Sequence, residues 1–162
     1  MSGYMENGNG LLISELEKLL RGGSAHVGLM EALANLPENL QGQRPQQLPY
    51  SIWQLVEHIR IAQWDMLEFC QNTNHESPQW PEGYWPKEPA PKNPGAFKAS
   101  VEQINRDLEA FIKLMKKNNL YKPLEHGNGQ TILREALQIA DHTAYHVAEI
   151  IVIRRLLQSW KP

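Results

Sequence analysis

The chain has 162 residues, a formal net charge of −2 and a hydrophobic content of 41%. This length suffices for one domain, residues 1–162, with a hydrophobic core, and the balanced charge argues against a nucleic-acid binder that relies on phosphate contacts. A single cysteine, Cys70, excludes an internal disulfide, no apolar run reaches transmembrane length, and nothing resembles a secretory signal. We therefore expect a cytoplasmic protein with neither a membrane nor a nucleic acid as partner.

The N-terminal part predicts one long helix that is interrupted by glycines. Residues 1–10 are polar and rich in glycine, and we expect them to be frayed and flexible. A stripe of leucines follows, and Gly22-Gly23 end it in the manner of a helix C-cap. Ser24 then has the position of a new N-cap. His26, in the first turn after this break, is either a partly exposed residue near a helix start or a group that leans over a site formed by neighbouring helices.

The clearest helix start in the chain lies at Ser51, after a proline-rich loop. Ser51 and Gln54 have the spacing of a capping box, and apolar residues then recur at helical intervals to about Gln71. His58 flanks this apolar face. Taken alone it is a core or boundary histidine, but it is also the natural third ligand for histidines on another helix.

Residues 72–95 form a long segment in which prolines and aromatic residues are concentrated. Such a segment cannot be helical for long, and a loop of this length in a compact domain is either functional or disordered. Trp80, Tyr84 and Trp85 favour an ordered loop. It is either the wall or lid of a pocket, with these aromatics and His26 as candidate pocket residues, or a loop held over a helix end by its aromatic side chains. Both interpretations can hold.

Two further helices are predicted in the C-terminal half. Asn93 as N-cap and Pro94 at the first helical position begin one of them, which ends near Lys117. Thr131 is the expected N-cap of the other. That helix would run to Trp160 and would be roughly 40 Å long.

Four helices with apolar stripes, and no convincing strand alternation, predict an all-α four-helix bundle. The long Pro/Trp-rich loop would connect helices two and three. His75 and His126 fall in irregular segments, where we expect them to be surface residues.

The last predicted helix carries the strongest candidates for a functional site. His142 and His146 are four residues apart, so their side chains point the same way, about 6 Å apart along the axis. The zincin motif binds zinc with this spacing but needs a glutamate between the histidines, and none is present here. The Glu-x-x-His pairs of di-iron bundles are also absent. Spacing alone leaves a metal site and a pair of core histidines equally open.

Adding His58 would give three imidazoles with open coordination positions, as in a catalytic rather than a closed structural site. Imidazole ligands suit zinc, nickel, copper and iron. An ion held there would act as a Lewis acid that lowers the pKa of a bound water or thiol. Glu149, one turn from His146, is a candidate acid–base or ligand-orienting group, or it forms a surface salt bridge.

Two segments, SIWQLVEH ending at His58 and DHTAYH over residues 141–146, resemble the metal-binding segments of the DinB-like superfamily. The WPEGYWP loop at residues 80–86 and the GNGQT stretch at 127–131 resemble one branch of it. The resemblance covers nearly the whole chain. It implies a four-helix bundle in which His58, His142 and His146 hold a divalent metal ion, nickel or zinc first, with iron and manganese as alternatives. It also implies a homodimer and, as in characterised relatives, transferase or isomerase chemistry with a low-molecular-weight thiol.

These observations support two functional hypotheses. The first is a metal-dependent enzyme, a hydrolase or a thiol S-transferase, that activates water or a low-molecular-weight thiol for reaction with a small-molecule substrate. The second is a non-enzymatic helical binding or assembly module whose histidines are structural. The aromatic loop favours the second hypothesis, because Trp and Tyr are enriched at interfaces.

Overall fold

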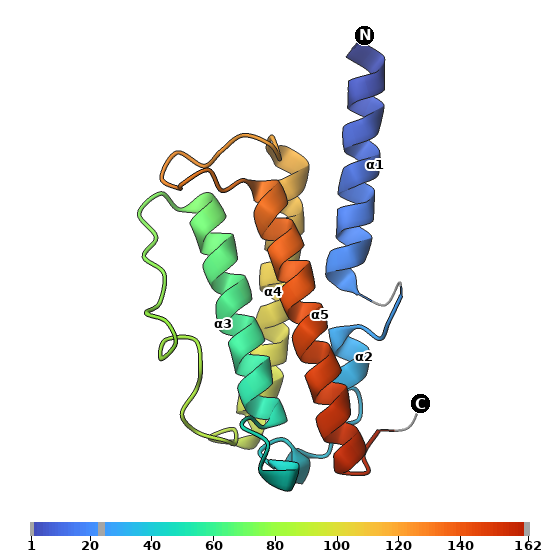
Figure 1. Cartoon of the computed structure of the whole chain (residues 1–162), viewed down its shortest axis with the longest axis vertical. Helices are drawn as coiled ribbons and strands as arrows, with labels where there is room; N and C mark the ends of the chain where they lie inside the picture. The colour runs from blue at the N-terminus through green and yellow to red at the C-terminus, as the bar shows by residue number, and fades with distance from the viewer. Residues whose placement is uncertain (1, 23–24, 161–162) are drawn as a thin grey trace.

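The computed structural model describes residues 2–22 and 25–160, and these residues fold into helices and loops without a β-strand (Figure 1). The helices are α1 (Ser2–Arg21), α2 (Leu29–Leu33), α3 (Ile52–Gln71), α4 (Pro94–Lys117) and α5 (Ile132–Leu156). Two short 3-10 turns, η1 (Glu38–Leu40) and η2 (Pro45–Gln47), lie between α2 and α3. The predicted all-α fold is confirmed.

The long helices α3, α4 and α5 stand side by side, and α1 lies along α5 and α4 at one end of the bundle (Figure 1). Because α3 runs up and α5 runs down in that view, the two helices are antiparallel neighbours. Residues 72–93 form an irregular connection that follows the outer side of α3. The connection therefore lines one face of the α3–α5 pair.

Local capping signals set the starts of the three longest core helices. The Ser51 hydroxyl accepts a hydrogen bond from the Gln54 amide, and the Gln54 side chain accepts one from the Ser51 amide, which completes the predicted capping box. Asn93 caps α4 at Gly95, and Thr131 caps α5 at Arg134. The three predicted N-caps are therefore confirmed.

The core consists of two apolar clusters, one at each end of the bundle. One joins α2 and the first half of α3 to the end of α5, and its fully buried members include Ala32, Ile52, Val56, Ile59 and Ile150. The other joins the end of α1 to the ends of α3 and α4 and the start of α5, with Phe111, Met115 and Ala136 at its centre. The candidate site lies between these two clusters along α3 and α5.

The N-terminal part differs from the prediction. The structure extends α1 back to Ser2, through the glycine-rich stretch expected to be frayed; its flexibility stays a prediction. Gly22 adopts a positive φ of 73°, which suits the end of a helix. Ser24, the predicted N-cap, lies outside the described residues. The next helix begins only at Leu29, behind Gly28, and is five residues long, so the predicted continuation from Ser24 is wrong for most of its length.

The end of the last helix also needs correction. The prediction placed it at Trp160, whereas α5 ends at Leu156 and the chain turns at Gln158, which has a positive φ of 54°. The buried guanidinium of Arg154 holds this turn by donating to the Ser159 carbonyl. Among residues 2–22 and 25–160, no helix combines the length and apolar character needed to cross a membrane.

Candidate metal centre

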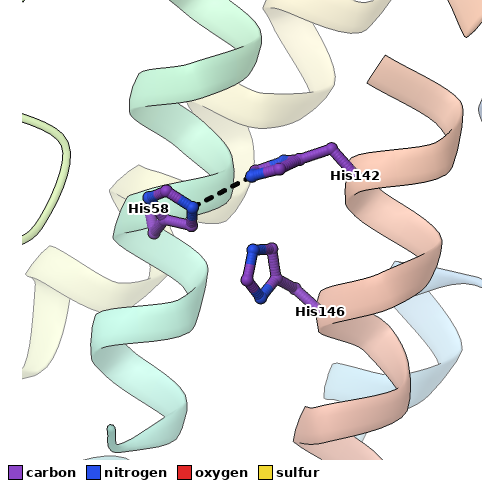
Figure 2. A group of neighbouring side chains, drawn as sticks. All are labelled: His58, His142 and His146. Carbon is purple, nitrogen blue, oxygen red and sulfur yellow. Dashed lines mark hydrogen bonds between the residues drawn. The ribbon is translucent and has the colours of Figure 1, made fainter. Parts of the chain in front are cut away.

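Three imidazoles converge in the space between α3 and α5. His58 projects from α3, and His142 and His146 project from successive turns of α5 (Figure 2). One nitrogen from each ring lies within 4.8 Å of the corresponding nitrogens of the other two rings. His58 and His142 approach most closely, with their Nε2 atoms 2.9 Å apart. The structure thus brings together the three histidines that the sequence identified as candidate metal ligands.

Neighbouring acceptors fix the orientation of two of these rings. Nδ1 of His58 donates to the Tyr84 carbonyl, 3.1 Å away, because a carbonyl oxygen can only accept. Nδ1 of His146 lies 2.6 Å from Oε2 of Glu149. In both rings the Nε2 lone pair is then left for the cluster, which is the usual arrangement of metal-ligating histidines. The predicted ion pair or orienting contact of Glu149 is therefore made with His146, while an acid–base role for Glu149 stays a prediction.

The environment keeps the two facing imidazoles neutral. Burial lowers the pKa of His58 to about 4, and the proximity of His146 adds to the shift. Burial likewise lowers the pKa of His142 to about 3, together with the neighbouring His146 and His58. A neutral imidazole carries the lone pair that binds a metal ion. Three converging imidazoles, two of them held neutral by burial, match the donor set of a divalent transition-metal site with open positions.

Aromatic residues wall the cluster on the side of the 72–93 loop. Trp85 stacks on His58 with ring centroids 3.8 Å apart and planes inclined by 8°. Tyr50 stacks on Trp85 at 3.9 Å. Trp80 lies further out, with its centroid 6.4 Å from that of His58, and is largely exposed. Of the three predicted pocket aromatics, Trp85 therefore lies directly against a histidine, and Trp80 lies further out.

The loop is fastened along α3 by a series of polar contacts. The contacts run antiparallel to the helix: Gln54 with the Pro86 carbonyl, His58 with the Tyr84 carbonyl, and Asp65 with both the Tyr84 hydroxyl and His75. The loop is thus held along the side of α3, and Trp80 and Tyr84 line a cleft there. His75 was expected at the surface. That prediction is wrong, because its side chain is only 6% exposed and pairs with Asp65.

His26, the remaining predicted pocket residue, is not brought to the histidine cluster. It lines a separate cavity of about 200 Å³, together with Leu20, Asn105 and Thr143. Its Nδ1 lies 3.0 Å from the carbonyl of Val27. His26 therefore stays next to α1 and α2, on the other side of α5 from the three imidazoles.

Two carboxyl groups near the cluster were not predicted from the sequence. Asp65 follows His58 by seven residues on α3, and Glu135 precedes His142 by seven residues on α5. In antiparallel helices these offsets lead in the same direction, two turns from the histidines, and both side chains line one cleft with His58 and His142. The equal seven-residue spacing was the available signal, but it has meaning only once α3 and α5 are known to be paired.

Comparison with known families agrees with this geometry. The family profile described as the DinB superfamily matches residues 25–150, well over half of the chain. The chain belongs to the DinB superfamily, and its histidine cluster fits a metal-binding protein of this type. Neither a curated protein nor a solved structure matches it.

Proposed function

We propose that this member of the DinB superfamily is a metal-dependent enzyme in which His58, His142 and His146 hold one divalent ion, with nickel or zinc as the first candidates and iron or manganese next. The enzyme activates water or a low-molecular-weight thiol for hydrolysis of, or transfer to, a small-molecule substrate. The observation that supports this proposal most is the convergence of three imidazole nitrogens within 4.8 Å, from two different helices. A bound divalent ion supplies Lewis acidity, which lowers the pKa of a water or thiol ligand.

The residues around the cluster support a functional rather than a structural centre. The Tyr84 carbonyl and the Glu149 carboxylate orient His58 and His146 through their Nδ1 atoms. Trp85 covers one face of His58 and shields it from water. The cleft beside His58 and His142 gives a small molecule access to the histidines. A purely structural site would be closed to ligands of this kind.

A thiol that reacts at this centre must come from outside the chain. The single cysteine, Cys70, is buried at the other end of α3. Burial and the nearby charge of Glu135 raise the pKa of its thiol to about 12, so that it stays protonated at neutral pH. If the enzyme is a thiol transferase, its thiol cofactor is therefore a separate low-molecular-weight molecule. The proposal places the reaction in the cytoplasm.

The proposal also includes a homodimer. Tyr145 and Val152 are exposed on α5 at 65% and 47%, beside a mainly apolar hollow that Leu48, Pro49 and Tyr50 close on the other side. A second copy of the chain would cover these apolar side chains. The same surface supports the competing function, a non-enzymatic assembly module. Light scattering after size-exclusion chromatography distinguishes a dimer, whose mass is twice 18.6 kDa, from a monomer.

Metal analysis tests the ligand set directly. Protein purified without affinity-tag nickel is stripped with a chelator, dialysed against zinc or nickel, and its metal content is measured by plasma mass spectrometry. We expect about one equivalent in the wild type, and a loss of most of it in His58→Ala and His146→Ala. His126→Ala is the matched control, because His126 is exposed and its ring nitrogen bonds to the Phe69 carbonyl, away from the three histidines. Equal metal content in all four proteins would contradict the proposed metal ligands.

An activity screen separates the enzyme from the assembly module. The zinc-, nickel-, iron- and manganese-loaded proteins are incubated with small thiols and electrophiles, and with chromogenic esters. Turnover that requires the metal and disappears in His58→Ala supports the enzyme. A stable dimer that binds no metal and turns over neither class of substrate supports the assembly module.

A further inference from the structure

A cavity lies on the side of α5 that faces away from the three histidines. It encloses about 200 Å³ between the end of α1, the start of α2 and the helices α3, α4 and α5. Its walls include members of both apolar clusters: Leu20 and Ala140 belong to one, and Leu29 and Val147 belong to the other. The cavity therefore lies where the two halves of the core meet.

Burial divides the lining of this cavity into a rim and an interior. The rim is formed by exposed residues, which include Arg21, His26, Met30 and Asn105. At the rim, Nδ2 of Asn105 donates to the sulfur of Met30 at 3.4 Å and joins α4 to α2. Of the buried residues in the described lining, all but Gln63 are apolar. A molecule in the interior would therefore be largely removed from water and surrounded by aliphatic side chains.

One anchored amide group lies in this apolar interior. Gln63 on α3 is 4% exposed, and its Nε2 donates to the Ile104 carbonyl at 2.7 Å, which fixes the position of the amide. The amide oxygen Oε1 can only accept a hydrogen bond. A molecule that carries a hydroxyl or N–H group therefore finds an acceptor inside the cavity, and a molecule without such a group does not.

The lining does not suit an ion. Among the described residues that line the cavity, Arg21 alone carries a permanent charge, and Glu17 and Glu109 pair with it. An ion in the apolar interior would lose its hydration without gaining a partner of opposite charge. Water is also held weakly, because an ordered water needs about two to four polar partners and Gln63 is the one polar side chain of the buried lining. The lining favours an uncharged organic molecule.

The volume limits the size of this molecule. A cavity of about 150 Å³ with apolar walls binds a molecule as large as benzene. The cavity here, about 200 Å³, therefore accommodates one ring with a small substituent. Molecules of drug size need pockets of about 300 Å³ or more.

We propose that this cavity is a binding site for a small uncharged molecule with one ring, whose hydroxyl or N–H group donates a hydrogen bond to Oε1 of Gln63. The ring lies between the two apolar clusters and contacts α1, α2 and α5, so its binding strengthens the attachment of α1 and α2 to the bundle. The site does not depend on the proposed metal-dependent function. Thr143 and Ala144 line the cavity, whereas His142 and His146, which flank them in the chain, point to the other side of α5.

A titration of the full-length protein with phenol tests the site without any catalysis. The side-chain methyl groups are labelled with ¹³C, and their shifts are followed by NMR. A molecule of about seven non-hydrogen atoms can bind with a dissociation constant of about 1 mM or below. We expect saturable shifts of the methyl groups of Leu29, Ala144 and Val147 with such a constant. If phenol caused no saturable shift of these methyl groups, the proposed site would be wrong.

Two variants that fill the cavity locate the bound molecule. Ala144→Leu fills it from α5, and Leu108→Phe fills it from α4. Each should raise the dissociation constant for phenol at least about tenfold, because a filled interior leaves no room for the ring. The matched control is Ala148→Leu, since Ala148 is exposed one turn further along α5 and lines a different hollow. Unchanged affinity in a folded cavity-filling variant would overturn the proposal.

The hydrogen bond to Gln63 is tested by comparing phenol with toluene, which has a methyl group in place of the hydroxyl. The ratio of the two affinities is measured in the wild type and in Gln63→Met, so that the difference in hydration between the two compounds cancels. We expect the preference for phenol to fall at least about fivefold in Gln63→Met, because Oε1 no longer accepts from the hydroxyl. An unchanged ratio would show that Gln63 does not select the ligand.

Discussion

Nε2 of His58 and Nε2 of His142 lie 2.9 Å apart, although 84 residues separate them in the chain. Nδ1 of His58 donates to the Tyr84 carbonyl, so Nε2 of the neutral ring is an acceptor and Nε2 of His142 donates to it in the absence of a metal. A third ring, His146, meets His58 nearly edge-on at a centroid distance of 4.7 Å. The buried, neutral imidazoles of His58 and His142 have consequences for stability as well as for metal binding.

The metal-free protein should lose stability as the pH falls below about 6.5. His58 and His142 have pKa values lowered from 6.5 to about 4 and about 3, so the unfolded chain binds protons that the folded protein does not. Stability is therefore full above pH 6.5 and decreases with acidification until the folded-state pKa values are reached. Between pH 7 and pH 5, His142→Gln should recover about 1–2 kcal/mol of the decrease.

Urea unfolding in the presence of a chelator, at pH 7 and at pH 5, measures this difference. The decrease for His142→Gln should be smaller than for the wild type, and His126→Gln, which changes an exposed histidine, should follow the wild type. If His142→Gln and the wild type lose the same free energy of unfolding, the facing imidazoles are not the source of the pH dependence.

Glu149 should matter for metal affinity through His146. Its Oε2 accepts a hydrogen bond from Nδ1 of His146 at 2.6 Å, which holds the ring with Nε2 toward the cluster. Removing such an orienting carboxylate weakens metal binding by about 10–100-fold. We expect Glu149→Ala to fall near the lower end of this range, because the side chain is partly exposed to solvent, and Glu149→Gln to be milder.

Competition with a chromophoric zinc chelator gives the affinities. Glu125→Ala removes a more exposed carboxylate, in the loop before α5, and should bind zinc as the wild type does. An affinity of Glu149→Ala within twofold of the wild type would mean that the ring of His146 is held by packing alone.

The sequence predicted those features that depend on residues close together in the chain. The starts of α3, α4 and α5 were predicted because Ser51, Asn93 and Thr131 act on backbone groups two or three residues away. The histidine cluster was predicted because helical spacing aligned His142 with His146. The place of His58 beside the apolar face of its own helix made it the natural third ligand, and the resemblance implied the same residue.

Features that depend on distant partners were missed. His75 was predicted to be a surface residue because its partner, Asp65, lies on a different element. The positions of Asp65 and Glu135 on one cleft likewise depend on the pairing of α3 with α5. The end of α5 was missed for the same reason, since the turn after it depends on a contact of Arg154 with the carbonyl of Ser159. Such contacts leave no periodic trace in the sequence.

The Tyr84 hydroxyl should stabilise the loop that walls the cleft. It donates to Oδ2 of Asp65 at 2.6 Å, and the backbone carbonyl of the same residue holds His58. Tyr84→Phe removes only the hydroxyl, so we expect a loss of about 1.5 kcal/mol in the free energy of unfolding, with faster amide hydrogen exchange over residues 75–86. The control is Tyr121→Phe, because that side chain is exposed.

Hydrogen exchange monitored by mass spectrometry distinguishes a local from a global effect. Protection should decrease in the loop and remain unchanged in α4. Uniformly faster exchange, or no change in the loop, would contradict a specific role of the Tyr84–Asp65 contact in holding the loop against α3.

Arg154 should be one of the most sensitive positions outside the cluster. It is 4% exposed, and its guanidinium donates to the carbonyls of Ala32, Ala34 and Ser159, at 2.6, 2.9 and 2.7 Å. It therefore links the end of α2 and the C-terminal turn to the last turns of α5, after the histidine pair. Arg154→Met keeps much of the side-chain volume but leaves these carbonyls without their donor, at an expected cost of about 2–4 kcal/mol.

The matched substitution is Arg155→Met on the exposed face of the same turn, which should change the free energy of unfolding by less than about 0.5 kcal/mol. Urea unfolding at pH 7 measures both. Because Arg154 lies two turns beyond His146, the metal-loaded Arg154→Met protein should still contain about one equivalent of metal at low urea, so that its loss is one of stability and not of ligand geometry. If the two methionine variants were equally stable, the three carbonyl contacts of Arg154 would contribute nothing to folding, and the attachment of α2 to the bundle would rest on its apolar residues alone.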